Sequence, residues 1–178
     1  MTLGIEIRQA VPSDASAACL LLRRSIEEGC VPDHGQRPDI LQAWLGNKTP
    51  QNVVAWFSSP SNHAIVAETA TGEGRELVGL ALLNQAGKLA LCYVRPDLVK
   101  SGVGSELLAA VERQARAWNI GKLHMHAPAS ASAFFERHGY INAGKDKACF
   151  GMECDFLWKQ MDAEACVPES KRFCKCTG

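Results

Sequence analysis

The sequence predicts a single-domain α/β (α+β) fold with helices and strands mixed along the chain. Apolar residues recur every three or four positions in some segments, as in amphipathic helices, and alternate with polar residues in others, as in strands. Three strand-like segments between residues 63 and 94 have connections too short for parallel crossovers, so they predict an antiparallel meander. The 178 residues suffice for one full core and are few for two.

The first third of the chain predicts one strand followed by helices. Ile5 and Ile7 alternate with charged neighbours, as in a half-buried strand. Ser13 or Asp14 is expected to cap the first helix, and Thr49 is expected to cap the third. The expected helices are 13–29, 38–45 and 49–57, and a turn-rich connection covers residues 30–38.

The rest of the chain predicts strands and two further helices. One helix runs from Gly102 to Trp118, and a short one spans Ser130 to His138, with Ser130 as its cap. Residues 1–159 thus form the domain, and residues 160–178 form a C-terminal tail with little periodicity. The expected strands are His63–Thr69, Leu77–Asn84, Lys88–Val94, Leu123–Ala127, Tyr140–Ala143 and Ala148–Trp158.

Composition and charge exclude several classes of function. The formal net charge is zero and the sequence pI is about 6.9, so no basic surface points to nucleic acid. The first six residues lack the basic start and apolar centre of a signal peptide. No apolar run approaches the ~20 residues needed to span a bilayer. We therefore expect a cytoplasmic protein without nucleic-acid or membrane partners.

Eight cysteines are many for a reducing compartment. Cys19, Cys92 and Cys149 lie in apolar contexts, where we expect reduced thiols packed as small hydrophobic groups. The tail holds three more: Cys166, Cys174 and Cys176.

The spacing of possible metal ligands predicts no metal site. Cys174 and Cys176 lack the paired Cys-x₂-Cys or histidine partners that zinc sites usually have. His124 and His126 share one face of a strand, but no third ligand has a suitable spacing. A thiol- or metal-responsive role for the tail remains the weaker alternative to free thiols.

The turn at residues 99–105, Val-Lys-Ser-Gly-Val-Gly-Ser, carries the strongest functional signal. Gly102 and Gly104 leave backbone N–H groups unobstructed at a helix N-terminus, whose partial positive charge suits a pyrophosphate. A P-loop would require Gly-Lys-Ser/Thr at this point, and a Rossmann fingerprint would require a third glycine. The turn therefore predicts a phosphate-bearing cofactor that is bound by neither nucleotide motif.

This turn resembles the acetyl-CoA loop of the GNAT superfamily of N-acetyltransferases. In that family a strand ending in Val-x-Pro precedes Gln/Arg-x-x-Gly-x-Gly/Ala and a helix. Residues 94–96 and 99–104 match this pattern, except that Val99 replaces the usual Gln or Arg. Residues 131–140, Ala-Ser-Ala-Phe-Phe-Glu-Arg-His-Gly-Tyr, are similar to the family's later Ala-x-x-Phe-Tyr-x-x-x-Gly-Phe segment. The order of elements resembles that of the family over residues 5–159.

The resemblance implies a three-layer fold, with helices on both faces of a mixed central sheet and an antiparallel meander that leads to splayed strands. It implies acetyl-CoA as the cofactor and a primary amine of a small molecule or peptide as the acceptor. A homodimer would be common for such a protein. A backbone N–H at Tyr93–Val94 would meet the thioester carbonyl and contribute about 3 kcal/mol to catalysis. The implied cofactor-binding residues are Tyr93, Val94, Val99, Lys100, Ser101, Gly102, Val103, Gly104, Ser105 and Phe135.

The position of the family's general acid is occupied in this sequence by a residue that cannot donate a proton. The tyrosine that protonates the departing thiolate corresponds to Phe135. In one interpretation the enzyme works without that acid, because a thiol of pKa about 8.5 leaves tolerably as thiolate, or Tyr93 replaces it. In the other, the domain is a CoA-binding regulatory or sensor module without turnover.

Candidates for the general base follow from position along the chain. His34 and Asp33 lie in the connection that roofs the acceptor site in GNAT proteins, and a solvated loop pair is an equally simple interpretation of them. Glu28 ends the preceding helix, and Glu68 lies in the first strand of the meander, where a solvent-facing side chain is the simpler expectation.

Overall fold

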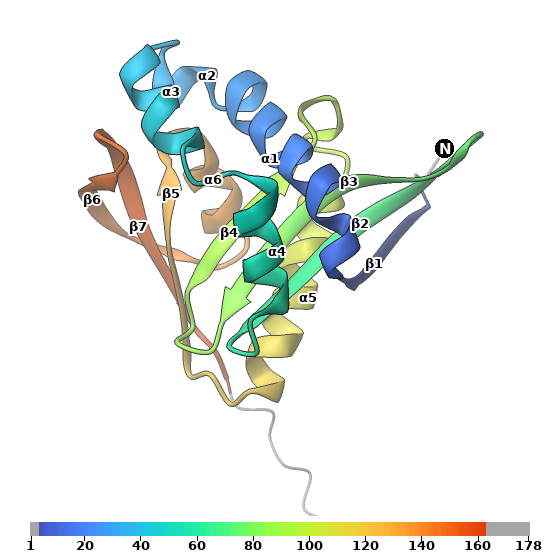
Figure 1. The fold of residues 1–178 in the computed structure, drawn as a ribbon. Coiled ribbons are helices and arrows are strands. Elements are labelled where there is room, and N and C mark those ends of the chain that lie inside the picture. The colour runs from blue at the N-terminus through green and yellow to red at the C-terminus, as the bar shows by residue number, and fades with distance from the viewer. Residues whose placement is uncertain (1–3, 163–178) are drawn as a thin grey trace, which may run out of the picture.

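The computed structural model describes residues 4–162 and is drawn as a ribbon in Figure 1. Its strands are β1 (Ile5–Gln9), β2 (Asn62–Thr71), β3 (Gly74–Asn84), β4 (Leu89–Val94), β5 (Lys122–Pro128), β6 (Ile141–Cys149) and β7 (Met152–Gln160). Its helices are α1 (Ala15–Gly29), α2 (Val31–His34), α3 (Pro38–Leu45), α4 (Pro50–Ser58), α5 (Val103–Ala117) and α6 (Ala129–Arg137). Short 3-10 turns, η1 (Pro12–Asp14) and η2 (Pro96–Leu98), precede α1 and the loop before α5.

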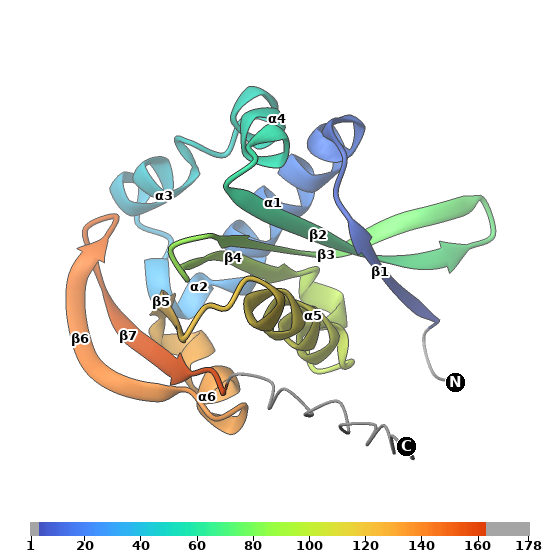
Figure 2. The same cartoon turned by 90° about the horizontal axis from the view of Figure 1, so that it is seen from below.

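Two antiparallel sheets form the middle layer, with strand orders β1-β2-β3-β4 and β5-β7-β6. Helices α1 and α4 cover one face of the first sheet and α5 covers the other, as Figures 1 and 2 show. Leu22, Val66 and Leu80 belong to the core under α1, whereas Val78 and Leu107 belong to the core under α5. This is the three-layer α/β arrangement predicted from the sequence.

A glycine in β3 allows α5 to approach the sheet closely. A Cβ atom at Gly79 would lie 2.7 Å from Cδ1 of Leu107 and 2.9 Å from Cγ1 of Val103, both on α5. Such distances are shorter than van der Waals contact, so a larger residue would push the helix away. The close approach sets the N-terminus of α5 beside the end of β4.

A β-bulge in β4 accompanies the division into two sheets. Leu89 lies opposite Leu83 and Leu91 lies opposite Leu82, so Ala90 is an extra residue in β4. Strands β4 and β5 run parallel and are joined by a bridge between Lys88 and His124, just before the bulge. Beyond it they belong to separate sheets and diverge. The predicted splayed strands and the mixed character of the sheet are thus confirmed.

The helix caps follow the prediction only in part. Thr49 Oγ1 accepts the backbone N–H of Asn52 at 3.2 Å and caps α4, as predicted. The prediction that Ser130 caps α6 is wrong, because the helix begins at Ala129 and Ser130 lies inside it. The carboxylate of Asp33 accepts both the backbone N–H of Ser130, at 3.0 Å, and its hydroxyl. Asp33 belongs to α2, a one-turn helix within the connection predicted as turns.

The C-terminal hairpin differs from its predicted boundaries. Strand β6 continues through residues 144–147, where a break was predicted, and the chain reverses at Phe150 and Gly151, with φ values of 52° and 82°. Gly144, with φ of 110°, lies between two residues where the register shifts, as in a bulge. Cys149 forms a disulfide with Cys154 of β7, so the prediction of a reduced thiol there is wrong. The pairing follows from a turn position that was not predicted.

Within residues 4–162, no helix is both long enough and apolar enough to cross a membrane. The predicted tail extends beyond these residues. Its cysteines, Cys166, Cys174 and Cys176, therefore lie outside the part of the chain that the structure describes.

Candidate active site

A cavity of about 740 Å³ lies between the diverging strands β4 and β5. Its walls also include α1, α6 and the loop before α5, and its volume is typical of sites for small molecules and cofactors. Of the residues that the sequence assigned to cofactor binding, those lining the cavity are Tyr93, Val94, Val99, Lys100, Gly102, Gly104, Ser105 and Phe135. Two do not line it. The hydroxyl of Ser101 donates to the carbonyl of Leu98 at 2.5 Å, and Val103 is fully buried in the core.

The N-terminus of α5 opens into this cavity without a side-chain cap. Gly102 is the N-cap residue with φ of 96°, and Lys100 before it also has a positive φ, 67°. The amides of residues 103–105 form the first turn, so the helix itself offers them no acceptor. This end of α5 therefore presents several N–H donors and a partial positive charge, which together suit a phosphate group.

Helix α6 forms the opposite side of this helix end. A Cβ atom at Gly104 would lie 3.2 Å from Cζ of Phe134, so the aromatic ring packs directly on the first turn of α5. His138 connects the two helices: Nδ1–H donates to the carbonyl of Phe134 at 2.8 Å, and Nε2 accepts the hydroxyl of Ser105 at 3.0 Å. The carbonyl can only accept, which fixes this tautomer and leaves neither ring nitrogen free.

The backbone of β4 directs one N–H into the gap between the strands. The N–H of Arg95 donates to the carbonyl of Val78 at 2.9 Å, toward β3. Alternation along an antiparallel ladder then turns the N–H of Tyr93 toward β3 and that of Val94 toward the β5 side. The carbonyl of Val94 points the same way and accepts the hydroxyl of Ser25 at 3.0 Å. Of the pair Tyr93–Val94, the geometry therefore assigns the free donor to Val94.

Tyr93 lines the cavity, and its hydroxyl can still donate a hydrogen bond. Its oxygen accepts the indole N–H of Trp44 at 3.2 Å, and because the indole is only a donor, the phenol hydrogen remains for another acceptor. Burial, followed by the neighbouring Cys30, raises the pKa of Tyr93 far above its usual value near 10. Tyr93 therefore stays neutral and keeps its proton throughout the physiological range.

Phe135 lies on α6 against the cavity wall and is 5% exposed. Its ring packs edge-on against Phe134 and Tyr140, at centroid distances of 5.0 and 5.6 Å. The residue therefore contributes apolar packing and no proton.

His34 lies outside the cavity and is 1% exposed. Its Nε2 is 3.1 Å from the carbonyl of Ile26, and its Nδ1 accepts the backbone N–H of Gln36 at 3.0 Å. Both nitrogens are thus used to fix the connection between α1 and α3. This geometry favours a structural role for His34 over the base role predicted from the sequence.

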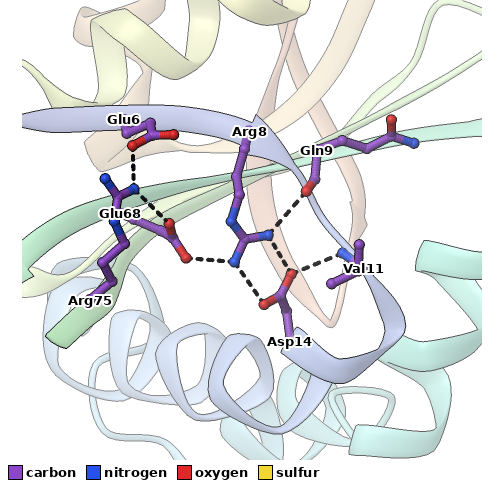
Figure 3. Close-up of polar contacts among 7 residues, drawn as sticks. All are labelled: Glu6, Arg8, Gln9, Val11, Asp14, Glu68 and Arg75. Atoms are coloured by element: carbon purple, nitrogen blue, oxygen red, sulfur yellow. Dashed lines mark hydrogen bonds and ion pairs between the residues drawn. The ribbon is translucent and has the colours of Figure 1, made fainter.

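Glu68 also lies away from the cavity, in the group of charged side chains shown in Figure 3. Its carboxylate contacts Arg8 at 2.5 Å and Arg75 at 3.2 Å, and it is 8% exposed rather than solvent-facing. Arg8 also binds Asp14 at 2.8 Å. Asp14 is the N-cap residue of α1, as predicted, but its side chain accepts the N–H of Val11 at the start of η1 and no amide of α1. The hydrogen bond from Arg8 lowers the pKa of Glu68. The cluster joins β1, β2, β3 and the start of α1.

We expect the Glu68→Gln substitution to reduce stability by about 1–2 kcal/mol at neutral pH, because it weakens the links to both arginines. The lowered pKa means that this stability is present above the unfolded value near 4.5 and is lost as pH falls through the folded value. Urea unfolding near pH 7 and near pH 3 measures the difference. A loss of equal size at both pH values would contradict this account, and Glu73→Gln, in the exposed β2–β3 turn, is the control.

The thiols that line the cavity are protonated at neutral pH. Burial raises the pKa of both Cys30 and Cys92 to about 12. A thiol in this state is a poor nucleophile. Among residues 4–162, no group of three or more histidine, cysteine or acidic side chains could hold a metal ion.

Sequence reasoning missed several residues that line the cavity. Ser25 and Cys30 reach it only through the packing of α1, so no local pattern could have found them. His138 lies within the segment 131–140 that carried the family resemblance, but its bond to Ser105 depends on the approach of α5 and α6. His126 shares a strand face with His124, as the sequence predicts, but the sequence pattern indicated only a metal ligand and not a residue of the cavity wall.

Comparison with known proteins identifies the class of protein. Residues 35–154 match the family model of the acetyltransferase (GNAT) domain. The match covers most of the chain, which therefore belongs to the GNAT acetyltransferase family. None of the curated protein sequences compared matches this chain.

Solved structures have the same fold. A GCN5-related N-acetyltransferase from Rhodopseudomonas palustris is 25% identical, with a TM-score of 0.76 over 90% of this chain and 98% of that one. PaiA N-acetyltransferase from Thermoplasma acidophilum, solved with coenzyme A, is 15% identical with a TM-score of 0.72, over 89% and 99% of the two chains. YncA from Salmonella typhimurium, solved with acetyl-CoA, is 18% identical with a TM-score of 0.65, over 94% and 99%.

Proposed function

We propose that this chain is an acetyl-CoA-dependent N-acetyltransferase that acts on a primary amine of a small molecule or peptide. The observation that carries the proposal is one cavity that joins the uncapped N-terminus of α5 to the gap between β4 and β5. Membership of the GNAT family and the two similar structures solved with coenzyme A or acetyl-CoA support this assignment.

The residues around the α5 N-terminus fit a diphosphate. The first-turn amides from Val103 to Ser105 supply donors, and Lys100 supplies a positive charge at the cavity wall. Val99, which replaces the usual Gln or Arg, is 56% exposed and offers only apolar contact. The backbone amides therefore carry most of the interaction in this proposal.

The chemistry that we propose is direct transfer to the amine. Acetyl-CoA, when bound, supplies the acetyl thioester. In this proposal the N–H of Val94 donates to the thioester carbonyl and the hydroxyl of Tyr93 donates to the leaving sulfur, which the free Val94 N–H and the remaining phenol hydrogen support. The protonated thiols of Cys30 and Cys92 support direct transfer over an acyl-enzyme.

A CoA-binding module without turnover is the second candidate, and Phe135 favours it. The position that provides a tyrosine hydroxyl in the family holds a buried phenylalanine here. Tyr93 is the observation that favours catalysis, since it lines the same cavity and its hydroxyl can still donate a hydrogen bond.

Calorimetry with CoA and a thiol-release assay with acetyl-CoA separate the two candidates. The amines tested are spermidine, phenethylamine, glycine and a lysine-containing peptide. We expect CoA to bind and at least one amine to release thiol above the rate of acetyl-CoA alone. Binding without thiol release from any amine would favour the sensor, and no binding heat would overturn both candidates.

A further inference from the structure

We propose that His126 on β5 takes the proton from the acceptor amine and that Asp146 on β6 holds it in the required tautomer. This inference rests on the proposed N-acetyltransferase function and adds the base that it needs.

His126 lines the cavity from β5, next to Met125 and Ala127. Met125 and Ala127 lie on the opposite face of the strand and belong to the core that also includes α5, whereas His126 is only partly buried. Its ring packs against Phe156 of β7 at a centroid distance of 5.1 Å. Across the gap, β4 contributes Tyr93 to the same cavity.

The contact with Asp146 fixes which imidazole nitrogen is basic. Nε2 of His126 lies 2.9 Å from Oδ2 of Asp146. A carboxylate only accepts hydrogen bonds, so Nε2 carries the hydrogen and Nδ1 keeps the lone pair. The carboxylate also stabilises the imidazolium that forms when Nδ1 takes a proton.

Other candidates for the general base in the described part of the chain already have hydrogen-bond or ion-pair partners. His138 is the second histidine of the cavity wall, and both its nitrogens are hydrogen-bonded. The carboxylate of Asp33 receives two hydrogen bonds from Ser130. His34 and Glu68 lie outside the cavity in structural contacts.

The proposed reaction moves the acetyl group from sulfur to nitrogen and one proton from nitrogen to solvent. The amine nitrogen forms a bond to the acetyl carbon while the carbon–sulfur bond breaks. The proton lost by nitrogen passes to Nδ1 of His126 and then to solvent, and the sulfur leaves as thiolate and takes a proton from Tyr93 or from solvent. Tyr93, where it supplies that proton, regains one from solvent. The products are an N-acetyl amine and CoA, and both side chains return to their starting states.

His126→Gln tests the base directly. Glutamine retains an N–H for Asp146 but has no basic nitrogen. With the panel amine of highest turnover, we expect kcat to fall about 100-fold, with CoA affinity by calorimetry unchanged. His124→Gln is the matched control, because His124 shares the strand face of His126 and lies outside the cavity wall. We expect it to retain the parent kcat.

Histidine side-chain NMR of the protein without cofactor gives an independent readout. We expect the hydrogen of the His126 imidazole to lie on Nε2, and a weaker preference for that tautomer in Asp146→Asn, together with a smaller loss of kcat than in His126→Gln. Equal kcat in His126→Gln and His124→Gln, or a parent protein with the hydrogen on Nδ1, would overturn the inference. A parent protein that binds CoA but acetylates none of the amines would instead overturn the proposed function.

Discussion

Replacing Gly104 by valine is expected to weaken CoA binding about 10- to 100-fold. An added Cβ atom would lie 3.2 Å from Cζ of Phe134 and 3.7 Å from Cγ2 of Val94, so the branched side chain must displace the ring or the first turn of α5. Either movement shifts the amides that face the cavity. Overpacking of this kind costs about 1–3 kcal/mol of stability, and returning the displaced amides to their binding geometry would cost CoA binding a similar energy, which corresponds to the expected loss of affinity.

Calorimetric titration with CoA measures the effect, and two variants make it interpretable. Gly104→Ala adds only the first atom and should give a smaller loss. Gly121→Val places the same side chain where no heavy atom lies within 4 Å of a Cβ atom, outside the cavity, and should bind CoA as the parent does. Parent-like affinity in Gly104→Val would refute the assignment of the phosphate site to this turn.

Removing the hydroxyl of Tyr93 is expected to lower kcat about 100- to 1000-fold, since a preorganised donor to the reacting group contributes that much. Tyr93→Phe keeps the ring in the cavity wall, so CoA affinity should change little. It also leaves the indole N–H of the buried Trp44 without its partner, at a cost in stability of about 1 kcal/mol. Steady-state kinetics with the panel amine of highest turnover measures kcat, and thermal unfolding confirms that the variant is folded.

The sequence contains one other tyrosine, which provides a matched control. Tyr140 is buried, does not line the cavity, and its hydroxyl has no hydrogen-bond partner among the described residues. Tyr140→Phe should therefore leave kcat unchanged. If both variants had the same kcat, the loss in Tyr93→Phe could not be assigned to proton or hydrogen-bond donation.

The order and type of most elements were predictable because their apolar patterns are regular. The stripe that includes Val103, Leu107 and Val111 is fully buried against β3, as its spacing predicts. The strand β6 was not predicted at full length, because its polar middle lies on an exposed sheet edge. Neither face is buried there, so apolar and polar residues do not alternate in the sequence. The bulge at Ala90 likewise has no local signal, although the splay of β4 from β5 follows it.

The candidate site was predictable where it depends on backbone geometry and not where it depends on long-range packing. The turn at Gly102 and Gly104 is readable because only its glycines and the following helix are needed. Side-chain roles required knowledge of neighbours distant in sequence. Glu68 is held by Arg8, sixty residues earlier, and His126 meets Asp146 only because β7 brings β5 and β6 into one sheet.

The hydrogen bonds from Ser130 to Asp33 link two short helices that are far apart in the sequence. Asp33 belongs to α2, and Ser130 lies in the first turn of α6, the helix whose Phe134 and Phe135 line the cavity. Moving α2 away from α6 would leave an amide and a hydroxyl without their carboxylate acceptor. Any displacement of α2 therefore carries an energetic cost at the cavity wall that α6 forms.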